Sequence, residues 1–280
     1  MSILSAYLQK SGGDSDRLVS CRTLYAAVIA LLIANAVATK AGQQIAYLGL
    51  PGAIASGLGF SWVFWLCAAL CIRLALTSDE APARPLDLWA LGACVVAAMV
   101  PVSPISSLAA TALGLFALWR GDERRRAAGM VLLAIAVQLL WSRLLMLVFA
   151  APIANLDAHL VGLITQIPVR GNLIPFADGV RAMAIEEGCT SVQNASIALM
   201  LFVAIVRTFR PRPAGSEIFY LLGAFLSVVA INTTRLSLMA QSLAAFQALH
   251  GAAGFTVINL IITVNGLAWA ALSVRREIFD

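Results

Sequence analysis

The sequence predicts an all-α membrane protein with about eight transmembrane helices and both termini in the cytoplasm. Of its 280 residues, 61% are hydrophobic and only 12% are charged, and the mean hydropathy is +0.89. Soluble domains are nearer half apolar and a quarter charged, and a single globular core of this size could not bury the excess. Long runs of Leu, Ala, Val and Ile favour helices over the strands of a membrane barrel.

Eight apolar segments can be interpreted as spans, because about 20 residues of helix cross the hydrocarbon core of a bilayer. Their approximate bounds are 22–39, 57–76, 86–102, 104–119, 127–150, 190–207, 217–234 and 252–274. The third and fourth segments meet between Pro101 and Pro104, where two prolines predict a break in the helix. We therefore treat residues 1–280 as one integral membrane domain.

The basic residues predict the orientation of the spans. If the eight segments alternate in direction, 14 of the 19 Lys and Arg residues fall on one side. These are Lys10, Arg17, Arg22, Arg73, Arg84, Arg120, Arg124, Arg125, Arg126, Arg207, Arg210, Arg212, Arg275 and Arg276. Because positive loops stay in the cytoplasm, we expect a multi-pass protein of the cytoplasmic (inner) membrane. The net charge of +5 then reflects orientation in the bilayer, and no nucleic-acid partner is inferred from it.

The first apolar segment also has features of a signal peptide, with basic residues ahead of it and small residues at its end. The long region that precedes it and the spans that follow favour a first helix that is not cleaved.

The longest weakly hydrophobic stretch, about 151–189, is predicted to lie outside the membrane. Within it, residues 153–166 have apolar side chains at helical spacing, which predicts an amphipathic helix along the membrane surface. Residues 167–175 predict an extended or hairpin-like element with a turn at Gly171 and Asn172.

Three residues suited to acyl transfer are predicted at the outer face. Cys189 lies at the outer start of the sixth segment, Arg235 at the outer end of the seventh, and His250 before the eighth. A thiol, a cation for a developing oxyanion and an imidazole that carries protons are the groups needed for covalent catalysis. The helix N-terminus and the cation are expected to lower the thiol pKa. Each residue alone has an ordinary explanation, but their shared face favours a site.

Acidic residues beside the cysteine are candidates for a supporting role. Glu186 and Glu187 could pair with Arg235 or orient His250, or they could simply be solvated acids at the start of a helix. The cysteines and histidines supply no set of four metal ligands, so neither a metal nor another cofactor is expected.

Three more polar residues are candidates for substrate binding or support. Asn232 lies one helical turn before Arg235 and could bind substrate or bridge helices. Arg143 lies inside the fifth segment, where it either holds helices together or contacts a substrate carboxyl group. Arg170 could guide substrate or be ordinary surface charge.

The sequence around these residues resembles the exosortase/archaeosortase family over about 167–265. The segments that carry the resemblance are 169–174 (Val-Arg-Gly-Asn-Leu-Ile) and 184–191 (Ala-Ile-Glu-Glu-Gly-Cys-Thr-Ser) around the catalytic cysteine, 231–236 as the arginine motif, and His250 with Gly251 and Gly254 as the histidine motif. The family usually has Cys-Ser-Gly-Leu where this chain has Cys-Thr-Ser-Val from Cys189 on. The loss of that Gly bears on how closely a substrate backbone can approach.

The resemblance implies a membrane-embedded cysteine protease or transpeptidase. Its substrate would be an exported protein whose C-terminal sorting signal combines a short motif such as Pro-Glu-Pro, an apolar helix and a basic tail. Cys189 would be the nucleophile, Arg235 the cation that positions substrate or stabilises the transition state, and His250 the general acid and base.

Two other functions remain open from the sequence. A transporter or channel would use Arg143 and Arg235 as contacts in an internal cavity. An inactive scaffold of a surface polysaccharide or export system is the other alternative. The substrate protein, the acceptor nucleophile and the oligomeric state are not determined by the sequence.

Overall fold

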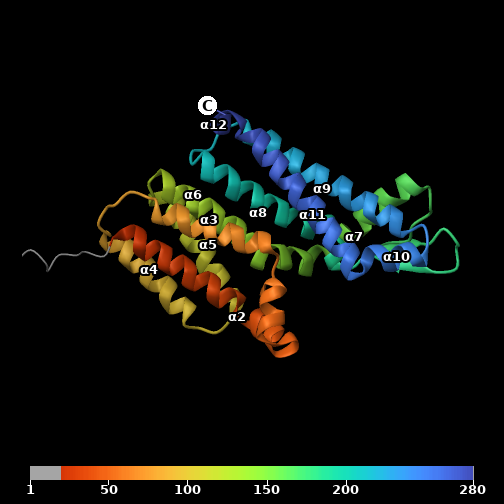
Figure 1. The fold of residues 1–280 in the computed structure, drawn as a ribbon, viewed down its shortest axis with the longest axis horizontal. Coiled ribbons are helices and arrows are strands. Elements are labelled where there is room, and N and C mark those ends of the chain that lie inside the picture. The colour runs from red at the N-terminus through yellow and green to blue at the C-terminus, as the bar shows by residue number, and fades with distance from the viewer. Residues whose placement is uncertain (1–19, 280) are drawn as a thin grey trace, which may run out of the picture.

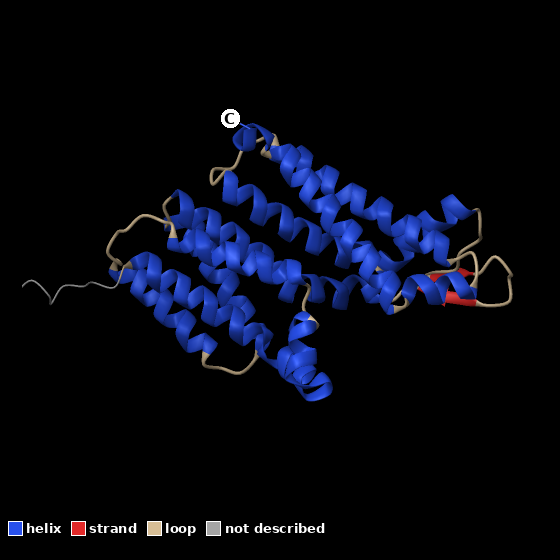
Figure 2. Ribbon diagram, in the orientation of Figure 1, coloured by secondary structure: helices blue, strands red, loops and turns tan. Residues whose placement is uncertain are grey.

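The computed structural model describes residues 20–279, and this part is helical except for one short hairpin (Figures 1 and 2). Its helices are α2 (Cys21–Ala55), α3 (Trp62–Leu76), α4 (Pro85–Ala98), α5 (Ser103–Arg120), α6 (Glu123–Ala136), α7 (Ser142–Thr165), α8 (Ser191–Phe209), α9 (Glu217–Met239), α10 (Leu243–His250), α11 (Ala252–Ser273) and α12 (Arg275–Phe279). The short elements are η1 (Gly57–Gly59), η2 (Val137–Trp141), η3 (Glu187–Cys189), β1 (Leu173–Pro175) and β2 (Ala182–Ala184). Lys10, Arg17 and any processing ahead of the first helix lie outside the described residues.

The all-α prediction is confirmed, and each predicted apolar segment forms a helix. Five helices of the described part are long and apolar enough to cross a membrane: α2, the continuous helix Glu123–Thr165, α8, α9 and α11. Helices α3 and α4 have only 15 and 14 residues, fewer than a helix needs to cross a bilayer of ordinary thickness. The break predicted by the two prolines is confirmed, since α4 ends at Ala98 and α5 begins at Ser103.

Helices α6 and α7 are joined through the π-helical turn η2 into one helix of 43 residues. At 1.5 Å per residue this helix is about 65 Å long, roughly twice the hydrocarbon thickness. It kinks at Phe149, whose φ and ψ are −118° and 18°, just before Pro152. The predicted surface helix over 153–166 is therefore the C-terminal part of this long helix, about half of α7.

This C-terminal part of α7 is amphipathic, with its small residues turned toward the protein. The large apolar residues Leu156, Leu163 and Ile164 are exposed, while the buried face consists of Ala154, Asp157, Ala158 and Val161. Small side chains allow the backbone of α7 to approach its neighbours closely, so they pack inward and the bulky residues face out.

Helix α8 lies between two groups of helices (Figure 1). On one side it packs against α3 and α6, and its residues Met200, Leu201 and Ala204 belong to the core formed by α2 to α6. On the other side it packs against α9 and α11 through two smaller cores. Helix α8 is therefore held from both sides.

At one end of the molecule, the C-terminal half of α7, the hairpin, the end of α9 and α10 share a separate core. The predicted Gly-Asn turn is confirmed: Arg170 and Leu173 exchange two backbone hydrogen bonds of 3.1 Å, and Gly171 has φ +61°. Strands β1 and β2 then pair antiparallel, with Ile174 opposite Met183.

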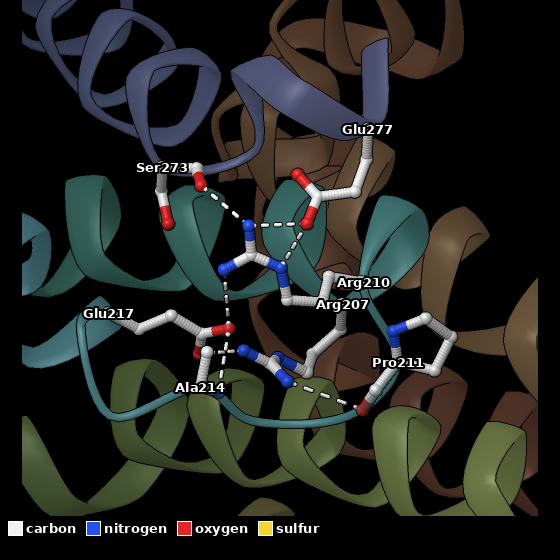
Figure 3. A network of polar contacts seen from close by, with 7 residues as sticks. All are labelled: Arg207, Arg210, Pro211, Ala214, Glu217, Ser273 and Glu277. Atoms are coloured by element: carbon white, nitrogen blue, oxygen red, sulfur yellow. Dashed lines mark hydrogen bonds and ion pairs between the residues drawn. The ribbon is translucent and has the colours of Figure 1, made fainter. Parts of the chain in front are cut away.

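An ion-pair network ties the helices at the opposite end (Figure 3). Arg207 at the end of α8 pairs with Glu217 at the start of α9. Arg210 pairs with Glu277 of α12 and donates to the carbonyl oxygen of Ser273 at 2.9 Å. These contacts fix α8, α9 and α11 relative to one another at the end away from the predicted site.

Two glycines test the close packing of α5 against α6. A Cβ at Gly129 would lie 2.8 Å from the carbonyl oxygen of Gly114 and 2.9 Å from the Ala117 Cβ, whereas a Cβ at Gly92 would meet nothing within 4 Å. We expect Gly129→Ala to destabilise the purified protein by about 1–3 kcal/mol through overpacking. Gly92→Ala should stabilise it slightly, because alanine favours a helix. Thermal unfolding in detergent measures both, and equal shifts of the same sign would contradict the packing.

Candidate active site

Cys189 lies directly ahead of α8 with its sulfur facing a histidine. It is the last residue of η3, and Thr190 is the N-cap of α8. The Cys189 Sγ is 3.7 Å from the His250 Nδ1. Only 7% of Cys189 is exposed, whereas His250, at the end of α10, is exposed. The structure therefore brings together a buried thiol and an imidazole that solvent reaches.

Helix α9 holds the backbone on both sides of this pair. The Asn232 Nδ2 donates to the carbonyl oxygen of Cys189 at 2.8 Å. One turn later, the Arg235 Nη2 donates to the carbonyl oxygen of Leu249 at 3.0 Å, directly before His250. Because Asn232 and Arg235 lie on one face of α9, a single helix sets the position of both the thiol and the imidazole.

Arg235 is buried and only partly satisfied. It is 2% exposed, and its Nε and Nη1 have no hydrogen-bond partner within the described residues. Leaving donors of a buried charged group unpaired is costly. The guanidinium is close enough to the Cys189 thiol to act on its charge. These two nitrogens are therefore available as donors to an oxygen atom that enters the site.

The imidazole of His250 is oriented by aromatic stacking. Its ring lies over Phe246, with the centroids 4.9 Å apart and the planes within 11°. Phe246 in turn packs edge-on against Phe176, with the ring centroids 6.0 Å apart, and Phe176 is buried next to the hairpin. The hairpin thereby supports the ring from one side while Nδ1 faces the sulfur.

Asp157 is part of the site, although the sequence analysis did not select it. Its carboxylate accepts from the Ser191 backbone N–H at 2.8 Å and from the Ser191 hydroxyl at 2.7 Å. A carboxylate at this position pairs an N–H that the helix leaves open and complements its dipole. One sequence signal could have indicated it, because an acid occurs among the small residues Ala154, Ala158 and Val161 at helical spacing.

Ser191 occupies the position where the resembled family has Gly. Its hydroxyl donates to Asp157 and accepts from the Asn232 Nδ2 at 3.2 Å, and Asn232 is bound in turn by Asn194 at 2.9 Å. All four residues are buried. The added side chain is therefore directed at protein partners on α7 and α9.

The other predicted candidates are more peripheral. Within the described residues, Glu186, Arg143 and Arg170 make no hydrogen bond or ion pair with the Cys189, Arg235 or His250 side chains.

The expectation that the acids pair with the arginine or histidine is not met by Glu186. Its carbonyl oxygen accepts from the Cys189 N–H at 2.9 Å, and its exposed side chain lines a cavity of about 410 Å³ between α7 and the hairpin. For Glu187 the structure describes the backbone alone. Both Arg143 and Arg170 are exposed.

The expected lowering of the thiol pKa is wrong for this arrangement. Burial raises the pKa of the Cys189 thiol above its ordinary value; Arg235 lowers it and Glu186 raises it, with burial the largest effect. The α8 N-terminus is already occupied by the Asp157 carboxylate. The resting cysteine is therefore a thiol at neutral pH, and it needs a base to become a nucleophile.

The chain matches no family model, no curated protein and no solved structure. The site itself combines a thiol, a base within reach, a buried cation with open donors, and backbone contacts that hold them.

The pH dependence of thiol modification tests the electrostatics of the site. Alkylation at Cys189, followed by peptide mass spectrometry, should show a midpoint above that of an ordinary cysteine because burial raises its pKa. Glu186→Gln should lower the midpoint, because the Glu186 carboxylate raises the pKa of the Cys189 thiol. Arg235→Gln should raise the midpoint, because the Arg235 guanidinium lowers that pKa. Asp178→Asn, on the hairpin loop, is the control and should leave it unchanged. A midpoint below the ordinary value would contradict this assignment.

The cap at Ser191 is tested by Asp157→Ala. Loss of the carboxylate leaves the Ser191 N–H buried and unpaired, so we expect a loss of about 1–2 kcal/mol in stability. Thermal unfolding in detergent measures it, with Asp79→Ala, an exposed acid at the other end, as the matched control. Equal unfolding midpoints for the two variants would show that the cap is unimportant.

Proposed function

We propose that this chain is a membrane-embedded cysteine protease or transpeptidase similar to the exosortase/archaeosortase family. It would cut the C-terminal sorting signal of exported, membrane-anchored proteins through a thioester intermediate. The observation that carries the proposal is the approach of the Cys189 sulfur to the His250 Nδ1, 3.7 Å, beside a buried Arg235 with two open donors.

In the first half of the proposed reaction, His250 takes the proton of the Cys189 thiol. The thiolate attacks the carbonyl carbon of the scissile peptide bond, and the carbonyl oxygen becomes an oxyanion. The Nε and Nη1 of Arg235 donate to that oxyanion, which accounts for their lack of a protein partner. When the intermediate collapses, the C–N bond breaks and the leaving amine takes the proton from His250.

In the second half, His250 removes a proton from the incoming nucleophile. That nucleophile, which is water, an amine or a hydroxyl, attacks the thioester carbonyl, and the Cys189 thiolate leaves and is protonated again. A buried, neutral thiol suits this scheme, because it becomes reactive only when His250 accepts its proton.

The proposed topology has eight spans, with both termini in the cytoplasm and the site at the outer face of the cytoplasmic membrane. Arginines at the end of α8 opposite Cys189 support this orientation: Arg207 lies in the last turn of α8, and Arg212 pairs with Glu123 at the start of α6. Helices α3 and α4 would cross beside the longer helix α2, which contacts both of them. In this orientation the outer half of α7, the hairpin and α10 cover the site.

An apolar cavity supports a substrate that contains an apolar helix. It has a volume of about 630 Å³ and is lined by η2, α7, α8 and α9. On α8 its lining begins at Val192, three residues after Cys189, and continues with Ala195 and Leu199 on the same face. A helix that follows the scissile bond into the bilayer would pass along this cavity.

Substitution of the nucleophile tests the proposed function. The chain is co-expressed with a protein from the same genome that ends in a short motif, an apolar helix and a basic tail. We expect Cys189→Ala to slow cleavage by about a thousandfold or more, while membrane insertion is unchanged. Cys94→Ala removes another buried thiol, far from the site on α4, and should cleave normally. Cleavage is measured as a shift in size on a gel.

Equal processing by the two variants would end the assignment. Solute transport by the purified protein in vesicles, with the same rate in Cys189→Ala, would instead favour the transporter.

A further inference from the structure

A polar cavity away from the proposed active site is lined by two cationic side chains, Lys40 and Arg143. Its volume is about 580 Å³. It is lined by Ala36, Thr39, Lys40, Gln43, Phe60, Pro101, Val102, Ser103, Pro104, Leu139 and Arg143. None of these residues is acidic, and among the described side chains no carboxylate lies within ion-pair distance of Lys40 or Arg143.

The two cations come from separate helices, yet they act on one another electrostatically. Lys40 belongs to α2 and Arg143 to α7, so the fold brings like charges together without a protein counter-ion. Such an arrangement is unfavourable in an apolar environment unless an anion neutralises it.

The ammonium group of Lys40 is held in place. It lies 4.7 Å from the centroid of the Phe60 ring. Its side chain also runs along the backbone at Gly59, whose φ is +81° and where a Cβ would lie 3.1 Å from the Lys40 Cε. The wall opposite is fixed too, since Ser103 donates to the carbonyl oxygen of Ala36. A cation that only extends toward solvent would not need these contacts.

Both cations lie about one hydrocarbon thickness from a basic residue at the other end of their own helix. Lys40 follows Arg22 by 18 residues in α2, and Arg143 follows Arg125 by 18 residues in the continuous α6–α7 helix. At 1.5 Å per residue each separation is about 27 Å, close to the thickness of about 30 Å of the apolar core. The exposed Trp141 beside Arg143 is typical of the membrane interface. With Arg22 and Arg125 at one membrane face, Lys40 and Arg143 would lie at the level of the lipid phosphates of the other.

We propose that this cavity binds the phosphate group of an anionic phospholipid. The guanidinium of Arg143 suits a phosphate through paired N–H groups, and Lys40 supplies a second positive charge. Leu139, Pro101 and Pro104 line the same cavity and suit the glycerol and the first acyl carbons. Free phosphate would satisfy the cations and leave these apolar walls uncovered, so a lipid is the better ligand. The proposal is independent of the proposed catalytic function.

Lipid binding by the full chain in detergent tests the proposal. The wild type, the double variant Lys40→Gln/Arg143→Gln and the control Arg73→Gln/Arg124→Gln are titrated with phosphatidylglycerol and followed by native mass spectrometry. The control removes two exposed cations from the other end and so matches the change in charge. We expect the double variant to bind its first lipid about tenfold more weakly, and the control to bind within about twofold of the wild type.

Two further titrations distinguish the source of the phosphate. Phosphatidylcholine should bind the wild type about tenfold more weakly than phosphatidylglycerol, because its own ammonium group opposes the two cations. Inorganic phosphate at the same concentration should not displace phosphatidylglycerol.

Equal affinities of the wild type and the double variant for phosphatidylglycerol would overturn the proposal. Displacement by inorganic phosphate would also overturn it, in favour of a soluble anion. Circular dichroism checks that the double variant folds. If it does not, Arg143→Gln alone, a change at an exposed side chain, takes its place and must bind the lipid more weakly than the control.

Discussion

The pairing of the backbone groups at the start of α8 is the constraint on which the region around Cys189 depends. A helix that begins near the membrane leaves N–H groups that water cannot satisfy. The carboxylate of Asp157 on α7 accepts a hydrogen bond from the Ser191 N–H. The Asn232 side chain on α9 donates to the carbonyl oxygen of Cys189, two residues earlier. Three helices are therefore positioned by hydrogen bonds at one point, and the location of the sulfur follows from the backbone.

The same burial that makes these hydrogen bonds strong also restrains the thiol. Removing Cys189 from water disfavours its charged form more than the nearby Arg235 favours it. The Nη2 of Arg235 donates to the Leu249 carbonyl oxygen, while Nε and Nη1 have no hydrogen-bond partner among the described residues. In the proposed chemistry, the cation therefore serves the oxyanion of the substrate, and His250 makes the thiolate.

Charge is distributed unevenly along the molecule. One end contains ion pairs between helices, such as Arg207 with Glu217 and Arg210 with Glu277 (Figure 3). At the other end, Arg235 keeps donors without protein partners and the pair Lys40 and Arg143 has no carboxylate among the described side chains. Ion pairs between helices suit a structural role, while cations left incomplete suit ligands that bring their own oxygen atoms.

Local sequence determined the features that depend on neighbouring residues: apolar segments long enough for helices, the break between Pro101 and Pro104, and the turn at Gly171. It also indicated that Cys189 and His250 belong to one end, because alternating helices place their ends in order. Only the tertiary structure decided which face of α7 is buried, that Asp157 meets Ser191, and that the thiol pKa is raised. These depend on distances between segments far apart in the chain and on the exclusion of water, which residue spacing does not encode.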